Sequence, residues 1–511
     1  MRNMLCVIIA SLLALAVMAE PPTVHNLGPW AYEIINAGDS SKGIGRVNLL
    51  VQGDSITSQT AGGRFCVGIR DAWRPYRWSG WSMSSADIVY NPESATTDPG
   101  WTITPAPATR IAGQLETNHY SYANTGVGIG LQYQSQQSGT YDTPTGTPAT
   151  PNTVNAGNSE ALKFAAMDYR EVVINADQAN ATFLFGWVTD FRTWNRFNSV
   201  AEPSWTASTY GNWSCKGDAV TARLIYFKNT SAPTSVTWKT YRRNSLNNST
   251  TFNPNGAAAI AYVDTDFNTS ATSDNLNAIR GQLHADSLGT NETGTVLPCL
   301  FVRFFRPNTP GLEVHNWSQP GWNFITFTDN TYAGMSTTYT PQLLAALGWP
   351  THLLLLHGQN QTTAQTNELN LGTSTTFKAN YNTWLNELMA AYIGAGQPLP
   401  KVCLLSPYKV GPVKLATDSR NVLNYATMDQ AIYEVAAARG YAFVSLLQMT
   451  PTGFEMEDND GSGGASYAAS LFMDPDSVHP LRAGSTYFMS GLWNQMLASQ
   501  IQKRPLRGRG R

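Results

Sequence analysis

Short apolar runs alternate with helical segments through the last third of the chain, and this alternation constrains the fold more than any other feature. The runs are bounded by polar or turn residues, as buried strands are, and the segments between them carry apolar residues at helical spacing. The expected strands are residues 353–356, 402–405 and 442–447, and the expected helices are residues 377–392, 428–438 and 480–501. Strands interleaved with helices form a parallel sheet covered on both faces. The sequence therefore predicts an α/β fold, with residues 47–51 as a central strand of the same sheet.

The middle of the chain has a different character. From residue 87 to residue 319, short β-rich runs recur between clusters of Asn, Gly, Pro and Ser, and few helices are expected. The clearest runs are residues 172–174, 182–188, 222–227, 236–241 and 300–305. We expect an inserted, jelly-roll-like β-sandwich here, because a long insertion in a surface loop costs the host fold little free energy.

Two short motifs near opposite ends of the chain supply a serine, a histidine and a carboxylate. The first is Gly53-Asp54-Ser55-Ile56-Thr57, and the second is Asp476-Ser477-Val478-His479-Pro480. A hydroxyl becomes an effective nucleophile when a base takes its proton and a third group orients that base. Ser55 follows an expected strand, which places it at the carboxyl edge of the sheet, where sites of α/β proteins form. We therefore predict Ser55 as the nucleophile, His479 as the base and Asp476 as the carboxylate that orients His479.

Each motif also has a plainer interpretation. Gly, Asp and Ser are common turn residues, so residues 53–55 also fit an ordinary turn. His479 also fits an exposed loop position beside a helix-capping aspartate. Asp474 is close enough to His479 in the sequence to take the place of Asp476.

Two further segments lie between these motifs. Asn330-Thr331-Tyr332-Ala333-Gly334 is turn-like, and His357-Gly358-Gln359-Asn360 follows an expected strand. With the two motifs, and in this order, they make the chain resemble the SGNH (GDSL-type) family of esterases and acylhydrolases over residues 44–85 and 320–502. The resemblance implies a three-layer α/β/α parallel sheet. It also implies an oxyanion hole formed by the backbone amides of Ser55 and Gly334 and the side-chain amide of Asn360; Gly321 competes with Gly334 for this role.

The chain departs from the commonest pattern of that family at two points. Gln361 stands where an acidic residue often follows the asparagine, and about 280 residues separate Ser55 from Gly334. Neither change removes a catalytic atom. The expected organisation is a catalytic domain of residues 20–86 and 320–502, an inserted and possible carbohydrate-binding domain of residues 87–319, and a basic flexible tail of residues 503–511.

The first 19 residues have the pattern of a secretory signal peptide. A short positive start is followed by an apolar run from Leu5 to Val17 and by small residues around Ala19. A retained N-terminal anchor is the alternative. We expect a secreted or periplasmic protein without a membrane span in the mature chain. Asn360 and Asn316 both begin glycosylation sequons, and a glycan would block the amide of Asn360, which favours export by a bacterial-type route.

Charge and cysteine usage narrow the possible partners. A formal net charge of −2 gives no field that would attract nucleic acid. The cysteines left after removal of the signal peptide are Cys66, Cys215, Cys299 and Cys403. None has metal-ligand spacing to a neighbour, so a zinc site is not expected. The predicted serine chemistry needs neither a metal nor an organic cofactor. Cys215 and Cys299 are the preferred disulfide pair, and Cys403 fits a buried thiol within an apolar strand.

These features together predict a secreted serine esterase of SGNH type. The favoured substrate is a carbohydrate or polysaccharide that carries O-acetyl or other short acyl groups, because the inserted region is rich in tryptophan and tyrosine, which stack on sugar rings. A lipid acyl-ester hydrolase is the enzymatic alternative. A catalytically inactive secreted carbohydrate-binding protein is the alternative from another class.

Overall fold

The computed structural model describes part of the chain. The described residues are 21–53, 56–57, 65–84, 101–102, 123–124, 129–134, 169–174, 182–185, 221–228, 230, 234–242, 245–266, 279–285, 296–318, 339–359, 374–409, 422–450, 480 and 482–501. Within some of these ranges, only the backbone of certain residues is described.

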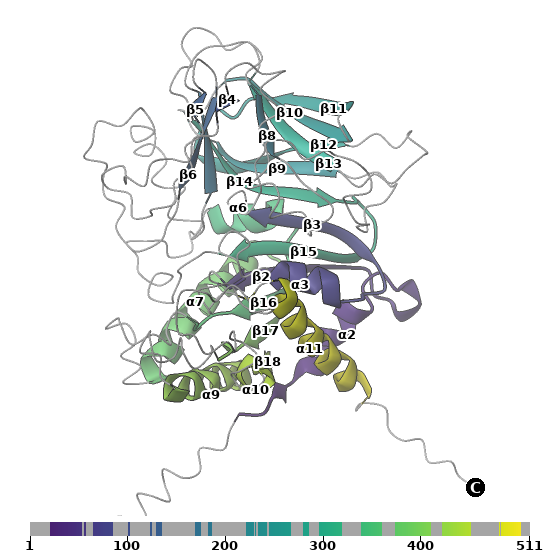
Figure 1. Cartoon of the computed structure of the whole chain (residues 1–511), viewed down its shortest axis with the longest axis vertical. Helices are drawn as coiled ribbons and strands as arrows, with labels where there is room; N and C mark the ends of the chain where they lie inside the picture. Colours follow the sequence, from purple (N-terminus) through teal and green to yellow (C-terminus); the bar gives the residue numbers. More distant parts are fainter. Residues whose placement is uncertain are drawn as a thin grey trace, which may run out of the picture.

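A parallel sheet forms the centre of the lower half of the molecule (Figure 1). Its strands follow the order β18-β17-β16-β2-β15-β3, and every neighbouring pair among them is parallel. Their bounds are β2 (Arg46–Gly53), β3 (Trp78–Ser84), β15 (Gly311–Ser318), β16 (His352–Leu356), β17 (Lys401–Leu405) and β18 (Ala442–Val444). The short strand β1 (Val24–His25) closes the outer edge by antiparallel pairing with β18.

Helices cover both faces of this sheet (Figure 1). They are α2 (Leu27–Ile35), α3 (Phe65–Ala72), α6 (Tyr339–Ala346), α7 (Ser374–Gly394), α9 (Val422–Arg439), α10 (Leu446–Met449) and α11 (Arg482–Ile501), with a short 3₁₀ turn, η1, at Ser40–Lys42. Along β2, Val47, Leu49 and Val51 pack with α2, α3 and α11, whereas Leu50 packs with α6, α7 and α9. This alternation gives two apolar cores and confirms the predicted three-layer α/β/α arrangement.

The same sheet continues into the β-rich half of the chain. Beyond β15 and β3 it becomes antiparallel through β14 (Val296–Phe305), which pairs with β3, β7 (Tyr169–Ile174) and β9 (Thr221–Lys228). The outer strands are β6 (Ile129–Gln134), which pairs with β7, and β12 (Ala259–Asp266), which pairs with β9.

A second sheet lies against this antiparallel part. It has the order β11-β10-β13-β8, formed by β8 (Thr182–Phe185), β10 (Val236–Arg242), β11 (Ser245–Phe252) and β13 (Ile279–Ala285). The indole of Trp238 on β10 is buried and donates to the carbonyl oxygen of Ala222 on β9 over 3.1 Å. A two-stranded sheet joins β4 (Trp101–Thr102) and β5 (Ala123–Asn124). Two β-layers therefore pack together as expected of a sandwich, but one of them is continuous with the parallel sheet.

Two strands differ from their expected positions. The predicted insertion of residues 87–319 includes β15, but β15 lies between β2 and β3 in the parallel sheet. The predicted strand at residues 442–447 ends at Val444, because the Ser445 hydroxyl accepts from the amide of Gln448 and caps α10. The boundaries of the insertion otherwise remain predictions.

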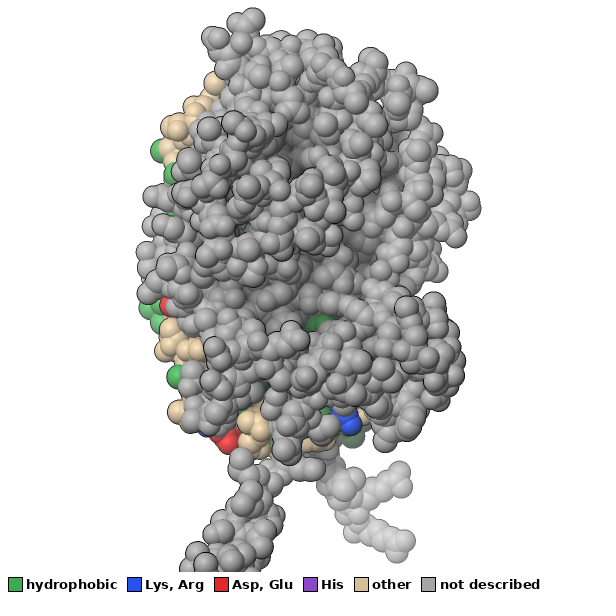
Figure 2. Space-filling view, turned by 60° about the vertical axis from the view of Figure 1, so that its left-hand side comes forward, with side chains coloured by type: hydrophobic (Ala, Val, Ile, Leu, Met, Phe, Trp, Pro, Cys, Tyr) green, Lys and Arg blue, Asp and Glu red, His purple; other side chains and the backbone are tan. Residues whose placement is uncertain are grey.

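Most of the described side chains visible in Figure 2 lie along the left margin and the lower end of the molecule, where apolar, acidic and basic groups are interspersed, and a further apolar patch is visible near the middle of the view. This mixture agrees with the small net charge of the chain. Among the helices of the described residues, none has the length and apolar character required to cross a bilayer.

Candidate active site at the carboxyl edge of the sheet

Four parallel strands end at the same level. Gly53 on β2 is in register with Ser318 on β15 and with Leu356 on β16, and Leu356 is in register with Leu405 on β17. The segments that follow these strands therefore leave the sheet at one edge. In α/β proteins this is the edge at which ligands bind.

The predicted catalytic and oxyanion residues themselves lie outside the described residues. They are Ser55, Gly334, Asn360, Asp476 and His479, together with the alternatives Gly321 and Asp474. Their mutual distances stay untested, and the structure instead describes the residues beside them. Gly53 and Ile56 flank the Ser55 position, Gln359 precedes Asn360, and the buried Pro480 follows His479.

Gly53, the last residue of β2, occupies a position without room for a side chain. A Cβ atom at this position would lie 2.4 Å from the carbonyl oxygen of Leu356 and 2.5 Å from the Thr57 hydroxyl oxygen. No larger residue fits there without displacement of backbone. Ile56 is buried in the core that contains α3. The two-residue stretch Asp54-Ser55 is therefore joined to fixed points on both sides.

Helix α3, in the first part of the chain, packs against helix α11, in its last part. A Cβ atom at Gly68 would lie 2.3 Å from the carbonyl oxygen of Ser485, so the two helices touch through their backbones. The indole of Trp73 adds a hydrogen bond of 3.0 Å to the carbonyl oxygen of Met489. Gly68 lies early in the helix that follows the Ser55 motif, and Ser485 lies in the first turn of the helix that follows the His479 motif. The packing thus brings the helix that follows the Ser55 motif against the helix that follows the His479 motif.

Aromatic side chains pack the segment after β17 against helices α3 and α11. The ring of Tyr408 stacks on that of Phe488 at a centroid distance of 4.7 Å, and the Phe65 ring lies 6.4 Å from Tyr408. All three residues are buried. A third strand end is therefore held against α3 and α11.

Two residues that precede Asn360, Gly358 and Gln359, restrict the segment after β16. Gly358 has φ +111°, a backbone conformation that residues with a Cβ rarely adopt, and a Cβ there would meet the Met428 side chain at 3.0 Å. The side-chain amide of Gln359 donates to the Tyr425 hydroxyl over 3.2 Å. The predicted glycine turn before Asn360 is therefore present.

Three of the seven histidines are unsuited to act as general bases. His315, His352 and His357 are buried, and burial lowers the pKa of each to about 3. A general base works best when its pKa is close to the operating pH. His357, although it follows a strand at the candidate edge, packs edge-on against Trp384 with the ring centroids 5.2 Å apart.

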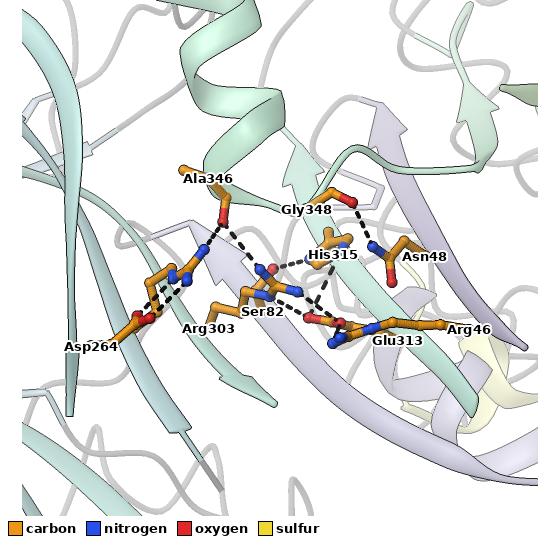
Figure 3. Close-up of polar contacts among 10 residues, drawn as sticks. Arg46, Asn48, Ser82, Asp264, Arg303, Glu313, His315, Ala346 and Gly348 are labelled. Carbon is orange, nitrogen blue, oxygen red and sulfur yellow. Dashed lines mark hydrogen bonds and ion pairs between the residues drawn. The ribbon is translucent and has the colours of Figure 1, made fainter. Parts of the chain in front are cut away.

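Ser82, His315 and Glu313 have the residue types of a catalytic triad, but this buried trio is not accessible to a substrate. The Ser82 hydroxyl lies 2.6 Å from Nδ1 of His315, and Nε2 of His315 lies 3.8 Å from Oε1 of Glu313 (Figure 3). All three residues are fully buried. Arg303 and Arg46 both bind the Glu313 carboxylate. We interpret the trio as a structural network, because no substrate can reach it and His315 is too weak a base to deprotonate Ser82.

Two buried side chains on β15 were not assigned to the site by the sequence. The amide of Asn316 donates to the carbonyl oxygen of Thr57, and the hydroxyl of Ser318 donates to Asn316. Their only sequence signal is the sequon Asn316-Trp317-Ser318, and burial of Asn316 makes this sequon inaccessible in the folded protein.

The described cysteines are thiols. Cys66 and Cys403 are buried and neither forms a disulfide bond, which confirms the interpretation of Cys403, and burial raises the pKa of its thiol. The predicted pairing of Cys215 with Cys299 lies outside the described side chains. Within the described ranges, the His, Cys, Asp and Glu side chains form no group of three or more that could hold a metal ion.

Comparison with known structures finds esterases and acylhydrolases. The chain is similar to a peptidoglycan O-acetylesterase at 12% identity and a TM-score of 0.49, over 94% of this chain and 100% of that chain. It is similar to a lipase/acylhydrolase from Enterococcus faecalis at 16% identity, a TM-score of 0.24, and coverage of 37% and 77%. A carbohydrate acetylesterase from Sinorhizobium meliloti matches at 11% identity, a TM-score of 0.27, and coverage of 37% and 79%. No protein-family model and no curated protein matches the chain.

Proposed function

We propose that this chain is a serine carboxylic ester hydrolase of SGNH type that removes O-acetyl or other short acyl groups from a carbohydrate outside the cytoplasm. One observation carries the proposal: the strands that precede the Ser55 and Asn360 segments end in register at one edge, where α3 packs against α11. The order of the four sequence motifs then assigns a chemical role to each segment.

The proposed reaction begins at Ser55. His479 takes the proton from the Ser55 hydroxyl, which attacks the ester carbonyl, and Asp476 holds the imidazole in the required tautomer. The amides of Ser55, Gly334 and Asn360 donate to the oxyanion that forms. His479 then protonates the leaving alcohol. Water repeats the sequence on the acyl-enzyme and releases the acid. Loss of one oxyanion donor from such a site costs about 10²–10³ in kcat.

The carbohydrate substrate is supported by the composition of the chain. Its surface charge is low, and the β-rich half carries many tryptophans and tyrosines, whose rings can stack on sugars. Export is supported by the signal-peptide pattern of the first 19 residues. Acetylated glycans of cell walls are the natural polymers to test first.

The test compares two serine variants on a chromogenic acetyl ester. Ser55→Ala should abolish hydrolysis, whereas Ser82→Ala, the matched change in the buried trio, should keep kcat near the wild-type value in the folded protein. Full activity of Ser55→Ala, or loss of turnover in the folded Ser82→Ala protein alone, would refute the assignment of the nucleophile.

The same assay, with the substrate varied, identifies the acyl group and the alcohol of the ester that is cleaved. The rate should be highest for acetyl and fall as the acyl chain grows, and acetate should be released from O-acetylated xylan or O-acetylated peptidoglycan. A preference for long acyl chains would indicate a lipid acyl-ester hydrolase instead. Absence of turnover, together with retention on immobilised polysaccharide, would indicate the inactive binding protein.

A further inference from the structure

The turn that carries Ser55 is bound by a side chain from the neighbouring strand. The amide nitrogen Nδ2 of Asn316 on β15 donates to the backbone carbonyl oxygen of Thr57 over 3.3 Å. Both residues are buried. Because Thr57 is only two residues from Ser55, this bond acts on the chain directly after the proposed nucleophile.

The position of Asn316 follows from strand register. Asn316 and Ser318 are paired in parallel register with Val51 and Gly53 on β2. Neighbouring residues in register project to the same face of a sheet. Val51 packs in the core that contains α3. The side chains of Asn316 and Ser318 therefore point to the face of the sheet against which α3 packs.

The two hydrogen-bond partners of the Asn316 amide show which end of the amide faces Thr57. The Thr57 carbonyl oxygen can only accept, so Nδ2 must point toward it. Oδ1 then faces Ser318, whose hydroxyl donates to it over 2.6 Å. Ser318 is itself buried. The amide thus donates on one side and accepts on the other, and rotation by a half turn would set its Oδ1 against the Thr57 carbonyl oxygen, two acceptors that cannot bond each other.

We infer that Asn316 and Ser318 are positioning residues for the nucleophile, an inference that rests on the proposed function. Gly53 anchors the turn before Ser55, and the bond from Asn316 anchors it after Ser55. Covalent geometry keeps adjacent Cα atoms about 3.8 Å apart, so fixing Ile56 and Thr57 restricts the position of Ser55. Ser318 acts through Asn316 by holding its amide in the donating orientation. Neither residue touches the substrate in this assignment.

A positioning role predicts a kinetic effect that a purely structural role does not. Displacement of a reacting group by about 1 Å can cost about 10²-fold in rate. Loss of the Ser318 bond should therefore lower kcat and leave KM nearly unchanged, since substrate contacts are kept. If the two residues served only to satisfy buried polar groups, their loss would lower stability while the folded fraction kept its full kcat.

The test uses Ser318→Ala, Ser318→Thr and Asn316→Asp in the full chain. Ser318→Ala should lower kcat about tenfold and Asn316→Asp about a hundredfold, because a carboxylate cannot donate to the Thr57 carbonyl. Ser318→Thr keeps the hydroxyl and should restore kcat. Covalent labelling of Ser55 by phenylmethylsulfonyl fluoride should slow in the same order. If Asn316→Asp does not fold, the Ser318 pair still decides the outcome.

Thr265→Val is the matched control. The Thr265 hydroxyl is also buried on a strand, where it lies within hydrogen-bond distance of the Trp238 carbonyl oxygen and the Thr250 hydroxyl, far from this edge in the sheet. Its loss should lower the melting temperature as much as Ser318→Ala does and leave kcat unchanged.

The possible failures can be told apart. A wild-type protein that hydrolyses no ester and resists labelling at Ser55 would overturn the proposed function and this inference with it. An active wild type with unchanged kcat and unchanged labelling rate in Ser318→Ala and Asn316→Asp would overturn the positioning role alone.

Discussion

The carboxylate of Glu313 on β15 is paired with the guanidinium of Arg303 on β14 across an intervening strand. Nε of Arg303 lies 2.5 Å from Oε1 and Nη2 lies 3.0 Å from Oε2. Between them runs β3, whose residues at this level are Gly80 and Ser82. Their small side chains leave room for the pair. Arg303 also donates to the carbonyl oxygen of Ala346 at the end of α6, so its contacts join β14 and β15 to a helix terminus (Figure 3).

Removal of the buried carboxylate should destabilise the whole sheet. Burial opposes ionisation of Glu313, but the neighbouring charges, Arg303 foremost, outweigh it and hold the pKa at about 2. Glu313→Gln leaves Arg303 and Arg46 without their counter-charge, which we expect to lower the free energy of unfolding by about 3–5 kcal/mol. Urea denaturation measures this change.

The control for that prediction is the same substitution in an exposed pair. Glu434 on α9 binds Lys378 on α7, and both side chains are partly open to water. Glu434→Gln should cost less than about 1 kcal/mol. Equal losses for the two variants would contradict the importance assigned to the buried pair.

The protein should lose stability in mild acid. Burial lowers the pKa of His315, His352 and His357 to about 3, whereas these groups titrate near 6.5 in the unfolded chain. The unfolded state therefore binds more protons below pH 6.5, so stability is full above that pH and decreases as the pH falls toward 3. Each such histidine should contribute about 1.4 kcal/mol per pH unit in this window.

A single substitution checks the source of this acid sensitivity. His357→Phe keeps an aromatic ring between Tyr381 and Trp384 and removes one titrating group. The dependence of the unfolding free energy on pH between 6 and 4 should become less steep in this variant. An unchanged slope would mean that His357 does not stay neutral in the folded protein.

Gly53→Ala should damage the candidate site more than the fold. The added methyl group would meet the Leu356 carbonyl oxygen at 2.4 Å, so the turn before Ser55 must shift. We expect a loss of about 1–3 kcal/mol in stability and a larger relative loss in Ser55 labelling by a sulfonyl fluoride. Gly45→Ala is the control, because no atom lies within 4 Å of a Cβ built there. Normal labelling of Gly53→Ala would argue against a tight turn.

Gly358→Ala should lower kcat through the segment that carries Asn360. Its φ of +111° is strained for alanine, and the new methyl group would press on Met428, so we expect a cost of about 1–3 kcal/mol and a displaced Asn360 amide. Gly394→Ala, at the end of α7 with no atom within 4 Å of the added Cβ, should leave kcat unchanged. Steady-state kinetics on an acetyl ester compares the two. Equal kcat values in the two variants would show that Gly358 does not help to position Asn360.

Much of the fold could be predicted from local sequence pattern. The apolar runs of β16 and β17 and the helical spacing of α7 and α11 were sufficient to place these elements within a few residues, whereas α9 begins at Val422, six residues before its predicted start. Strand β18 was predicted three residues too long, because the apolar residues Leu446 and Leu447 continue the run while Ser445 caps a helix. A side-chain cap of this kind competes with strand extension over a single residue, which periodicity alone does not resolve.

The sequence by itself determined the order of the motifs, the α/β class and the strands that precede Ser55 and Asn360, because these depend on residue type and on spacing along the chain. Only the tertiary structure decided that β15 lies beside β2. Its polar Glu313 and His315 alternate with the apolar Leu312 and Val314, a pattern typical of a half-buried strand, yet every residue of β15 is buried. That burial is possible because Arg303, on the preceding strand of the chain, and Arg46, 267 residues away in the sequence, neutralise Glu313. Such compensation depends on contacts between distant segments, and so does the bond from Asn316 to the turn of the proposed nucleophile.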